Sequence, residues 1–279
     1  MKKLPIAVVS ITKNEAFHLP DFLDHLRGRV EEVIIVDSFS DDATLSIANE
    51  RGARVIQRVF RDFGDQWNFA IAVPTDQPWT MKLDPDERVP EDLWKAIERA
   101  ISENAPRNGY HMIRRLWFMG KPLHVTQKIL RLWRTGKCRF TDVIVNEHPI
   151  VEGDLGTLGG FLEHLDSKDL QDWVNKQNHY STLEAITASE NRNLAANPRF
   201  FGTQFERRMW LKKNICHIPL RYQLLWIYNY FFSGAWRDGR EGMAWVHLRV
   251  WVHRMKEFKT LELARKAQFL DARDLAQPE

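Results

Sequence analysis

The sequence has few cysteines, almost no net charge and no long apolar run, and each of these absences argues against a class of protein. Its two cysteines, Cys138 and Cys216, lack C-x-x-C spacing, which argues against a disulfide framework or a zinc site and fits a reducing cytoplasm. The 40 Lys and Arg nearly balance the 37 Asp and Glu, so the net charge of +3 gives no argument for nucleic acid as a partner. No apolar run reaches the roughly 18 residues of a membrane span, and the N-terminal run is too short for a secretory signal.

Two phosphate-binding patterns are also missing. No G-x-G-x-x-G opens the first predicted helix, which excludes a nicotinamide-dependent Rossmann enzyme. A nucleotidyltransferase needs a glycine-rich, basic loop after its first strand, whereas residues 12–15 are Thr-Lys-Asn-Glu and supply an acid. That alternative is therefore disfavoured.

What the sequence does contain is an alternation of strand and helix patterns. With 44% hydrophobic residues in 279, the chain predicts an ordinary packed core. β-Branched runs at 6–11, 33–36 and 53–57 alternate with helical patterns at 16–28 and 44–51, which predicts an α/β fold with a doubly wound, mainly parallel sheet. Residues 110–150 are β-rich, and the chain becomes helical from about 167 onward. We therefore predict a nucleotide-binding catalytic domain over 1–165 and a helical extension over 166–279.

Three carboxylates, Asp84, Asp86 and Glu87, follow a short apolar strand. Carboxylates this close repel one another, so a divalent cation is the simplest way to hold them, although a solvated acidic turn is the alternative. Their hard oxygen ligands suit Mg²⁺ or Mn²⁺ and leave open positions for a phosphate. Since the carboxyl ends of parallel strands meet at one edge, residues 12–15, 37–42 and 84–87 are expected to converge on one crevice, which favours the metal site.

Other polar residues are weaker candidates. Gln66 and Asn68 lie near the start of a predicted helix, where amides either contact a nucleotide or cap the helix. Asn146-Glu147-His148 and Glu163-His164 each place a carboxylate beside an imidazole. Because a lone histidine is more often an ordinary surface or core residue, neither pair identifies a site by itself.

The last third of the chain interleaves aromatic and basic residues. Residues 205–256 hold five tryptophans together with many Arg and Lys. On amphipathic helices this combination is typical of a surface that contacts anionic lipid headgroups. Packing of a helical subdomain accounts for the same residues, and stacking on nucleic acid is a third interpretation that no groove-binding motif supports.

Four ordered motifs give the sequence a family resemblance. They are Ile-Thr-Lys-Asn-Glu (11–15), Val-Asp-Ser-Phe-Ser-Asp-Asp-Ala-Thr (36–44), Phe-Gly-Asp-Gln-Trp-Asn-Phe-Ala (63–70) and Leu-Asp-Pro-Asp-Glu-Arg (83–88). Together they resemble the family 2 glycosyltransferases of the GT-A fold. Asn-Glu-His, Phe-Leu-Glu-His-Leu and Ser-Gly-Ala-Trp-Arg-Asp-Gly-Arg-Glu-Gly resemble, more narrowly, the branch that adds β-1,4-glucose to the lipopolysaccharide core.

The resemblance implies roles for the matching residues. The nucleotide-sugar would be lined by Thr12, Asn14, Glu15, Asp37, Gln66, Asn68 and Asp84, and the divalent metal (Mn²⁺ or Mg²⁺) would be held by Asp86 and His164. Family 2 enzymes invert, so one carboxylate must deprotonate the acceptor hydroxyl. We predict Glu147 for this role, with Asp142 and Glu163 as alternatives.

The implied activity is metal-dependent transfer of a hexose such as glucose from a UDP-sugar. The acceptor would be a lipid-linked or lipid A core glycan, and the chain would lie in the cytoplasm, peripherally on the inner membrane, without a nucleic-acid partner. A non-catalytic nucleotide- or glycan-binding protein is the alternative from another class.

Four positions depart from the family pattern. Phe39 and Ala43 stand where glycine is usual, which is expected to restrict the loop near the nucleotide. Pro85 stands where alanine is more frequent and should leave both flanking carboxylates in place. Asn146 stands where the narrower branch often has histidine, so the role of that position is open.

Overall fold

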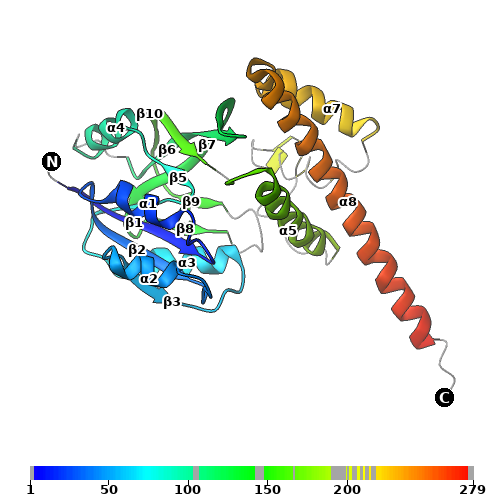
Figure 1. The fold of residues 1–279 in the computed structure, drawn as a ribbon, viewed down its shortest axis with the longest axis horizontal. Coiled ribbons are helices and arrows are strands. Elements are labelled where there is room, and N and C mark those ends of the chain that lie inside the picture. The colour runs from blue at the N-terminus through cyan, green and yellow to red at the C-terminus, as the bar shows by residue number, and fades with distance from the viewer. Residues whose placement is uncertain are drawn as a thin grey trace. The chain divides into compact units, whose positions relative to one another are not determined.

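The computed structural model describes residues 3–102, 107–141, 148–165, 167–189 and 218–275, together with 199, 201–202, 206–207, 210 and 214; for 189 and 267–275 it describes the backbone alone. The described residues form two units, one up to Ser167 and one from Lys168 onward. The elements of the first unit are β1 (Leu4–Thr12), α1 (Leu19–Leu26), β2 (Val30–Asp37), α2 (Thr44–Glu50), β3 (Arg54–Gln57), α3 (Phe63–Ala72), β4 (Trp79–Lys82), β5 (Glu87–Arg88), α4 (Glu91–Ser102), β6 (Gly109–Phe118), β7 (Lys121–Arg134), β8 (Cys138–Phe140), β9 (Pro149–Val151) and β10 (Leu155–His164) (Figure 1).

Within the described chain, eight strands of this unit form one sheet in the order β3-β2-β1-β4-β7-β6-β10-β5. Strands β3, β2, β1 and β4 are all parallel to one another. Beyond β4 the sheet is mixed, because β7 runs antiparallel to both β4 and β6. The predicted α/β GT-A-type architecture is confirmed, including the change of pattern after the parallel half.

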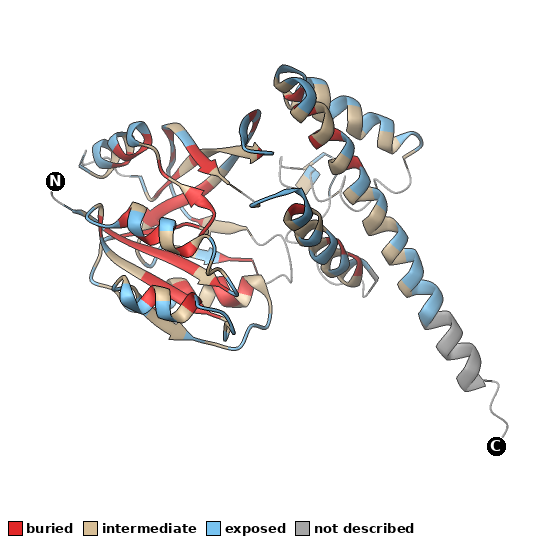
Figure 2. Cartoon of the chain, in the orientation of Figure 1, coloured by how far each residue is buried: buried red, intermediate tan, exposed pale blue. Residues whose placement is uncertain are grey.

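Strand β1 is a continuous apolar run because both faces of the sheet are covered. Ile6 and Val8 face one layer, where they join a core built with helices α1 and α4. Ala7 and Val9 face the other layer, where Trp67 of α3 packs. Figure 2 shows the buried residues concentrated on these central strands.

Strand β10 is not among the elements that the sequence predicts, because glycine is depleted in strands. It nevertheless pairs in parallel with β6 and antiparallel with β5. Gly156 shows why glycine is needed within it: a Cβ built there would meet the ring of Tyr110 at 2.6 Å. The strand places His164 opposite Glu87, a member of the acidic motif.

The second unit is helical, as predicted. It contains α5 (Leu170–Ser189), α7 (Arg221–Ile227), the π-helical turn η2 (Tyr228–Phe232), the 3₁₀ turn η3 (Ala235–Asp238) and α8 (Gly239–Leu275). Lys259 of α8 donates to the Asn178 side chain at 2.7 Å and to Ser181 Oγ at 2.9 Å on α5. In the part of the chain that the structure describes, no helix combines the length and apolarity of a membrane span.

The turn that leads into α8 depends on one glycine. A Cβ at Gly242 would lie 2.0 Å from the carbonyl oxygen of Ala235, far inside the contact distance of any side chain. Gly234, at φ 88°, reverses the chain just before η3. The segment Ser233–Asp238 can therefore fold tightly onto the first turns of α8.

Candidate active site

The predicted crevice begins where β1 and β2 end side by side. Thr12 and Asp37 are register partners in the sheet, and Thr12 Oγ1 donates to Asp37 Oδ1 at 2.9 Å. Asp37 is fully buried and also accepts from the Ser40 backbone N–H at 2.8 Å. The ends of β1 and β2 therefore meet as predicted, and the carboxylate expected to contact a nucleoside is bonded here to its own loop.

The loops after β1 and β2 are joined by hydrogen bonds in both directions. The Asn14 backbone N–H donates to Ser40 Oγ at 2.8 Å, and Asp41 N–H donates to Asn14 Oδ1 at 3.1 Å. The Glu15 N–H donates to Thr44 Oγ1 at 2.8 Å. These contacts hold Asn14 and Glu15 at the edge of the crevice, with the Glu15 carboxylate 4.0 Å from His18 Nδ1.

Gln66 and Asn68 both lie on α3, but their side chains contact different parts of the fold. Gln66 is fully buried, accepts from Arg58 at 3.1 Å and donates to Ser38 Oγ at 3.2 Å, just after β2. Asn68 instead forms a pair of hydrogen bonds with the Phe140 backbone, at 2.7 and 3.1 Å, and thereby fixes β8 against α3. Gln66 thus adjoins the Asp37 loop, whereas both the oxygen and the nitrogen of the Asn68 side-chain amide are hydrogen-bonded to the Phe140 backbone.

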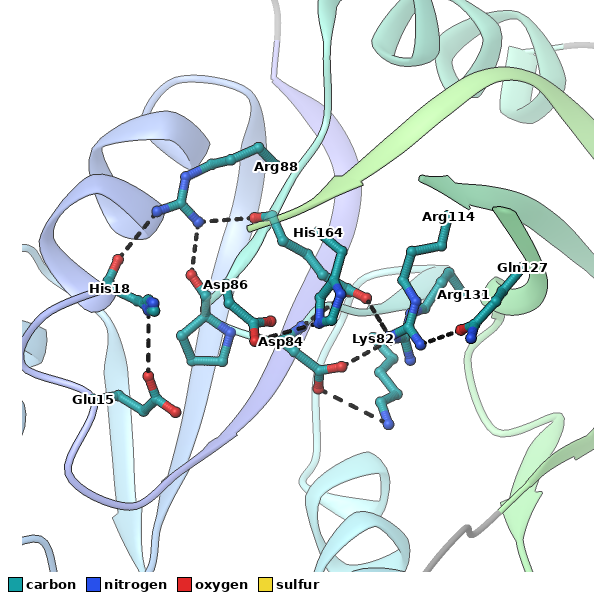
Figure 3. A network of polar contacts seen from close by, with 12 residues as sticks. Glu15, His18, Lys82, Asp84, Asp86, Arg88, Arg114, Gln127, Arg131 and His164 are labelled. Atoms are coloured by element: carbon teal, nitrogen blue, oxygen red, sulfur yellow. Dashed lines mark hydrogen bonds and ion pairs between the residues drawn. The ribbon is translucent and has the colours of Figure 1, made fainter. Parts of the chain in front are cut away.

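The acidic motif is held largely by the protein's own cations (Figure 3). Arg131 of β7 donates to Asp84 Oδ2 at 2.8 Å and to the fully buried Glu87 at 2.6 Å. Lys82 Nζ lies 3.9 Å from Asp84 and 3.8 Å from the centre of the Trp67 ring. A divalent cation, expected as the simplest way to hold the three carboxylates, is therefore not needed to hold Asp84 and Glu87.

The charge of Asp84 follows from the same contacts. Burial acts to raise the pKa of Asp84, but Lys82 and Arg131 outweigh it and keep the pKa below its ordinary value. Asp84 is thus an ionised carboxylate at neutral pH. The sequence analysis missed Arg131 and Lys82, although an arginine within the apolar run 129–133 is itself a signal of a buried ion pair.

Among the residues that the structure describes, Asp86 is the member of the motif with an imidazole beside it. Its Oδ2 is 3.4 Å from His164 Nε2, and both side chains are nearly buried. His164 Nδ1 is a buried nitrogen without a hydrogen-bond partner among the residues that the structure describes. A carboxylate oxygen and an imidazole nitrogen that converge in this way fit a divalent cation such as Mn²⁺.

The protein alone does not complete a metal shell in the described residues. No cluster of three or more carboxylate, imidazole or thiol groups there could hold a metal ion. Mg²⁺ and Mn²⁺ in nucleotide sites are commonly held by one or two protein ligands plus the phosphates of the substrate. Asp86 and His164 fit that arrangement.

Of the three carboxylates predicted as candidates for the general base, the structure describes only Glu163. Glu163 forms a two-point ion pair with Arg115, with one bond of 3.0 Å, and accepts from Trp117 Nε1 at 2.5 Å. Since both its oxygens are engaged and only 9% of the residue is exposed, Glu163 is placed as a structural ion-pair partner. Glu147 and Asp142 lie outside the described residues, as does Asn146.

The sheet order, the loops at the parallel strand ends and the acidic motif define an α/β protein of the GT-A type. The family model described as glycosyl transferase family 2 matches residues 7–128. This segment is therefore similar in sequence to the family 2 glycosyltransferases.

Individual proteins described as glycosyltransferases are similar over a longer part of the chain. An uncharacterized glycosyltransferase of Rickettsia prowazekii is 29% identical over 203 residues, covering 66% of this chain and 68% of the relative. An uncharacterized glycosyltransferase of Rickettsia felis is 28% identical over 232 residues, covering 74% and 81%. A solved mannosyltransferase of Pyrobaculum calidifontis, in complex with GDP-Man and Mn²⁺, is similar with a TM-score of 0.52 at 13% identity, covering 93% of this chain and 87% of that one. This last similarity shows the fold.

Proposed function

We propose that the chain transfers a hexose, with inversion, from a nucleotide-sugar to a saccharide acceptor. The observation that carries this proposal is that the Asp37 loop and the Asp86–His164 pair follow the carboxyl ends of β2 and β4, which both pair in parallel with β1. The first would hold a nucleoside and the second a metal-bound diphosphate. A UDP-sugar is our choice of donor, and a lipid-linked or lipopolysaccharide-core glycan is our choice of acceptor.

The residues divide the work of such a reaction. The bound cation would supply Lewis-acid stabilisation of the departing diphosphate, the largest charge that develops. Asp86 and His164 would hold it, while Arg131 and Lys82 keep Asp84 ionised beside the sugar. Gln66 and Asp37 would orient the nucleoside, and Glu147 would take the proton from the attacking acceptor hydroxyl.

Calorimetric titration with UDP tests the donor site. We expect UDP binding in Mn²⁺, loss of that binding in EDTA, and at least about tenfold weaker binding in Asp86→Ala, since metal-site residues typically contribute such factors. Asp154→Ala, which removes an exposed carboxylate of the same unit, is the matched control and should bind like the wild type.

The opposite results are equally informative. Equal UDP affinity in Mn²⁺, in EDTA and in Asp86→Ala would contradict the metal role of Asp86. If UDP binds but no UDP is released from UDP-sugars with or without acceptors, the chain is a nucleotide-binding protein without transferase activity.

A further inference from the structure

The helical segment formed by α7 and η2 turns large apolar side chains toward solvent, where a surface helix usually carries polar ones. Its solvent-facing positions recur at 223–224, 227–228 and 231–232, and all but the first are large and hydrophobic. We call Leu224, Ile227, Tyr228, Phe231 and Phe232 the apolar face. Phe232 is 79% exposed and Tyr228 59%. A helix that only packs on its own protein normally turns its polar side outward.

The inward side of this segment carries the polar groups that attach it to α8. Arg221 donates to Glu257 Oε1 at 2.9 Å, and Tyr222 Oη donates to Glu257 Oε2 at 2.6 Å. Arg254 of α8 lies 4.6 Å from the centre of the Tyr222 ring. Because these bonds fix the rotation of α7, the apolar face is held toward solvent and cannot be buried by a small roll of the helix.

The sequence up to and through the apolar face is basic, and the first acidic residues after it are Asp238 and Glu241. Residues 207–237 contain six Arg and Lys and no Asp or Glu. Beyond η2, Arg237 and Arg240 are both exposed, and Arg237 lies over the half-exposed Trp236 ring at 5.2 Å. A second copy of the chain on this face would bring like charges together, which is unfavourable, whereas an anionic surface would be attracted.

The side-chain types match a lipid interface. Tryptophan and tyrosine are enriched at the headgroup level because they have an apolar body and a polar edge, and phenylalanine and leucine enter the acyl region below. Tyr228 and Trp236 supply the first kind, and Leu224, Phe231 and Phe232 the second. A helix lying in the membrane surface with basic residues at its edge uses this combination.

We propose that the apolar face of α7 and η2 docks the protein on an anionic phospholipid surface, with Phe231 and Phe232 inserted among the lipid chains and Arg237 and Arg240 at the phosphates. This docking stands on the second unit alone and does not require the proposed transferase activity.

Co-sedimentation of the full chain with vesicles tests the docking. We expect binding to vesicles of phosphatidylethanolamine with phosphatidylglycerol, and several-fold weaker binding to phosphatidylcholine or in about 1 M salt, where charges are screened beyond roughly 3 Å. The double variant Phe231→Ser, Phe232→Ser should bind at least about tenfold more weakly, since burial of one such side chain is worth that factor. Arg237→Gln with Arg240→Gln should lose the preference for anionic lipid.

A matched control is available on α8. Phe258→Ser removes a phenylalanine that is 66% exposed but lies about 28 Å along α8 from its first residue, at 1.5 Å per residue, and should leave vesicle binding unchanged. Circular dichroism checks that each variant keeps its helices, and Asp86→Ala should still bind vesicles because the donor site is not involved.

Three outcomes would overturn the docking: absence of the wild type from every vesicle pellet, unchanged binding of the Phe231/Phe232 variant, or equal loss in Phe258→Ser. A wild-type dimer that the Phe231/Phe232 variant converts to monomers, without vesicle binding, would identify a second copy as the occupant instead. Leu224→Ser repeats the test with a milder change in the same face.

Discussion

His164 Nε2 lies 3.4 Å from Asp86 Oδ2, although β10 and the acidic motif are far apart in the sequence. The antiparallel pairing of β10 with β5, together with the Leu165 N–H that donates to the Asp86 carbonyl at 2.8 Å, brings the two side chains together. The strand pairing in the sheet therefore places a carboxylate oxygen beside an imidazole nitrogen.

Removing His164 should weaken the metal site and leave the fold intact. His164→Ala is expected to lower Mn²⁺ affinity by at least about tenfold in the presence of UDP, because one of the two proposed protein ligands is lost. Calorimetry in the same buffer measures this. His124→Ala, which removes an exposed histidine of β7, serves as the control, and equal affinity in both variants would show that His164 is no ligand.

Arg131 should matter for stability more than for donor affinity. Arg131→Met leaves the fully buried Glu87 with Arg114, 3.4 Å away, and is expected to lower the free energy of unfolding by about 3–5 kcal/mol. Urea unfolding measures the change, with Lys128→Met on the exposed side of β7 as control. The double variant Glu87→Gln, Arg131→Met should regain part of the loss; a double variant as unstable as the single one would argue against the buried Glu87 charge as the cause.

Substitutions of Glu147 and Glu163 should have different effects, one on catalysis and the other on stability. Glu147→Gln is expected to reduce the rate of UDP release from a UDP-sugar by about 10²–10⁴-fold while UDP affinity stays unchanged, because a general base contributes factors of this size. Glu163→Gln should instead lower the thermal midpoint, since its bonds to Arg115 and Trp117 are weakened. A Glu147→Gln enzyme of full activity would reject the assignment.

The second unit should lose stability in mild acid through His253. Burial, with a smaller contribution from Arg249, lowers the pKa of His253 to about 4, from an ordinary value near 6.5. The folded state therefore disfavours the proton, so stability is full above about pH 6.5 and falls as the pH drops toward 4, by about 2 kcal/mol when partial exposure is allowed for. Thermal unfolding of the wild type and His253→Gln across this range measures it; an identical pH profile in both proteins would exclude His253.

The parallel half of the sheet could be predicted because its signals are local. The apolar runs at β1 and β2 end at Thr12 and Asp37, and the rule that ligand sites form at such ends does not depend on the rest of the fold. The partners of the acidic motif could not be predicted in the same way. Arg131 and His164 reach Asp84 and Asp86 from antiparallel strands whose register no local pattern reveals.

The loop at Phe39 shows a second limit of sequence reasoning. Phe39 has φ 59°, a left-handed conformation that glycine adopts without cost and that other residues adopt at about 1–2 kcal/mol. Ala43, at φ −74°, needs no glycine. The loop thus keeps at Phe39 the backbone that a glycine favours, and a half-exposed phenyl ring is added beside the crevice.

The close approach of the Ala235 carbonyl to Gly242 limits which residue types position 242 can accept. In most positions of a helix, changing glycine to alanine is a stabilising substitution. At position 242 it would instead force the carbonyl of Ala235 aside and open the turn between η3 and α8. A selection for folded variants should therefore recover glycine alone at 242, while the neighbouring exposed Arg240 tolerates many residue types.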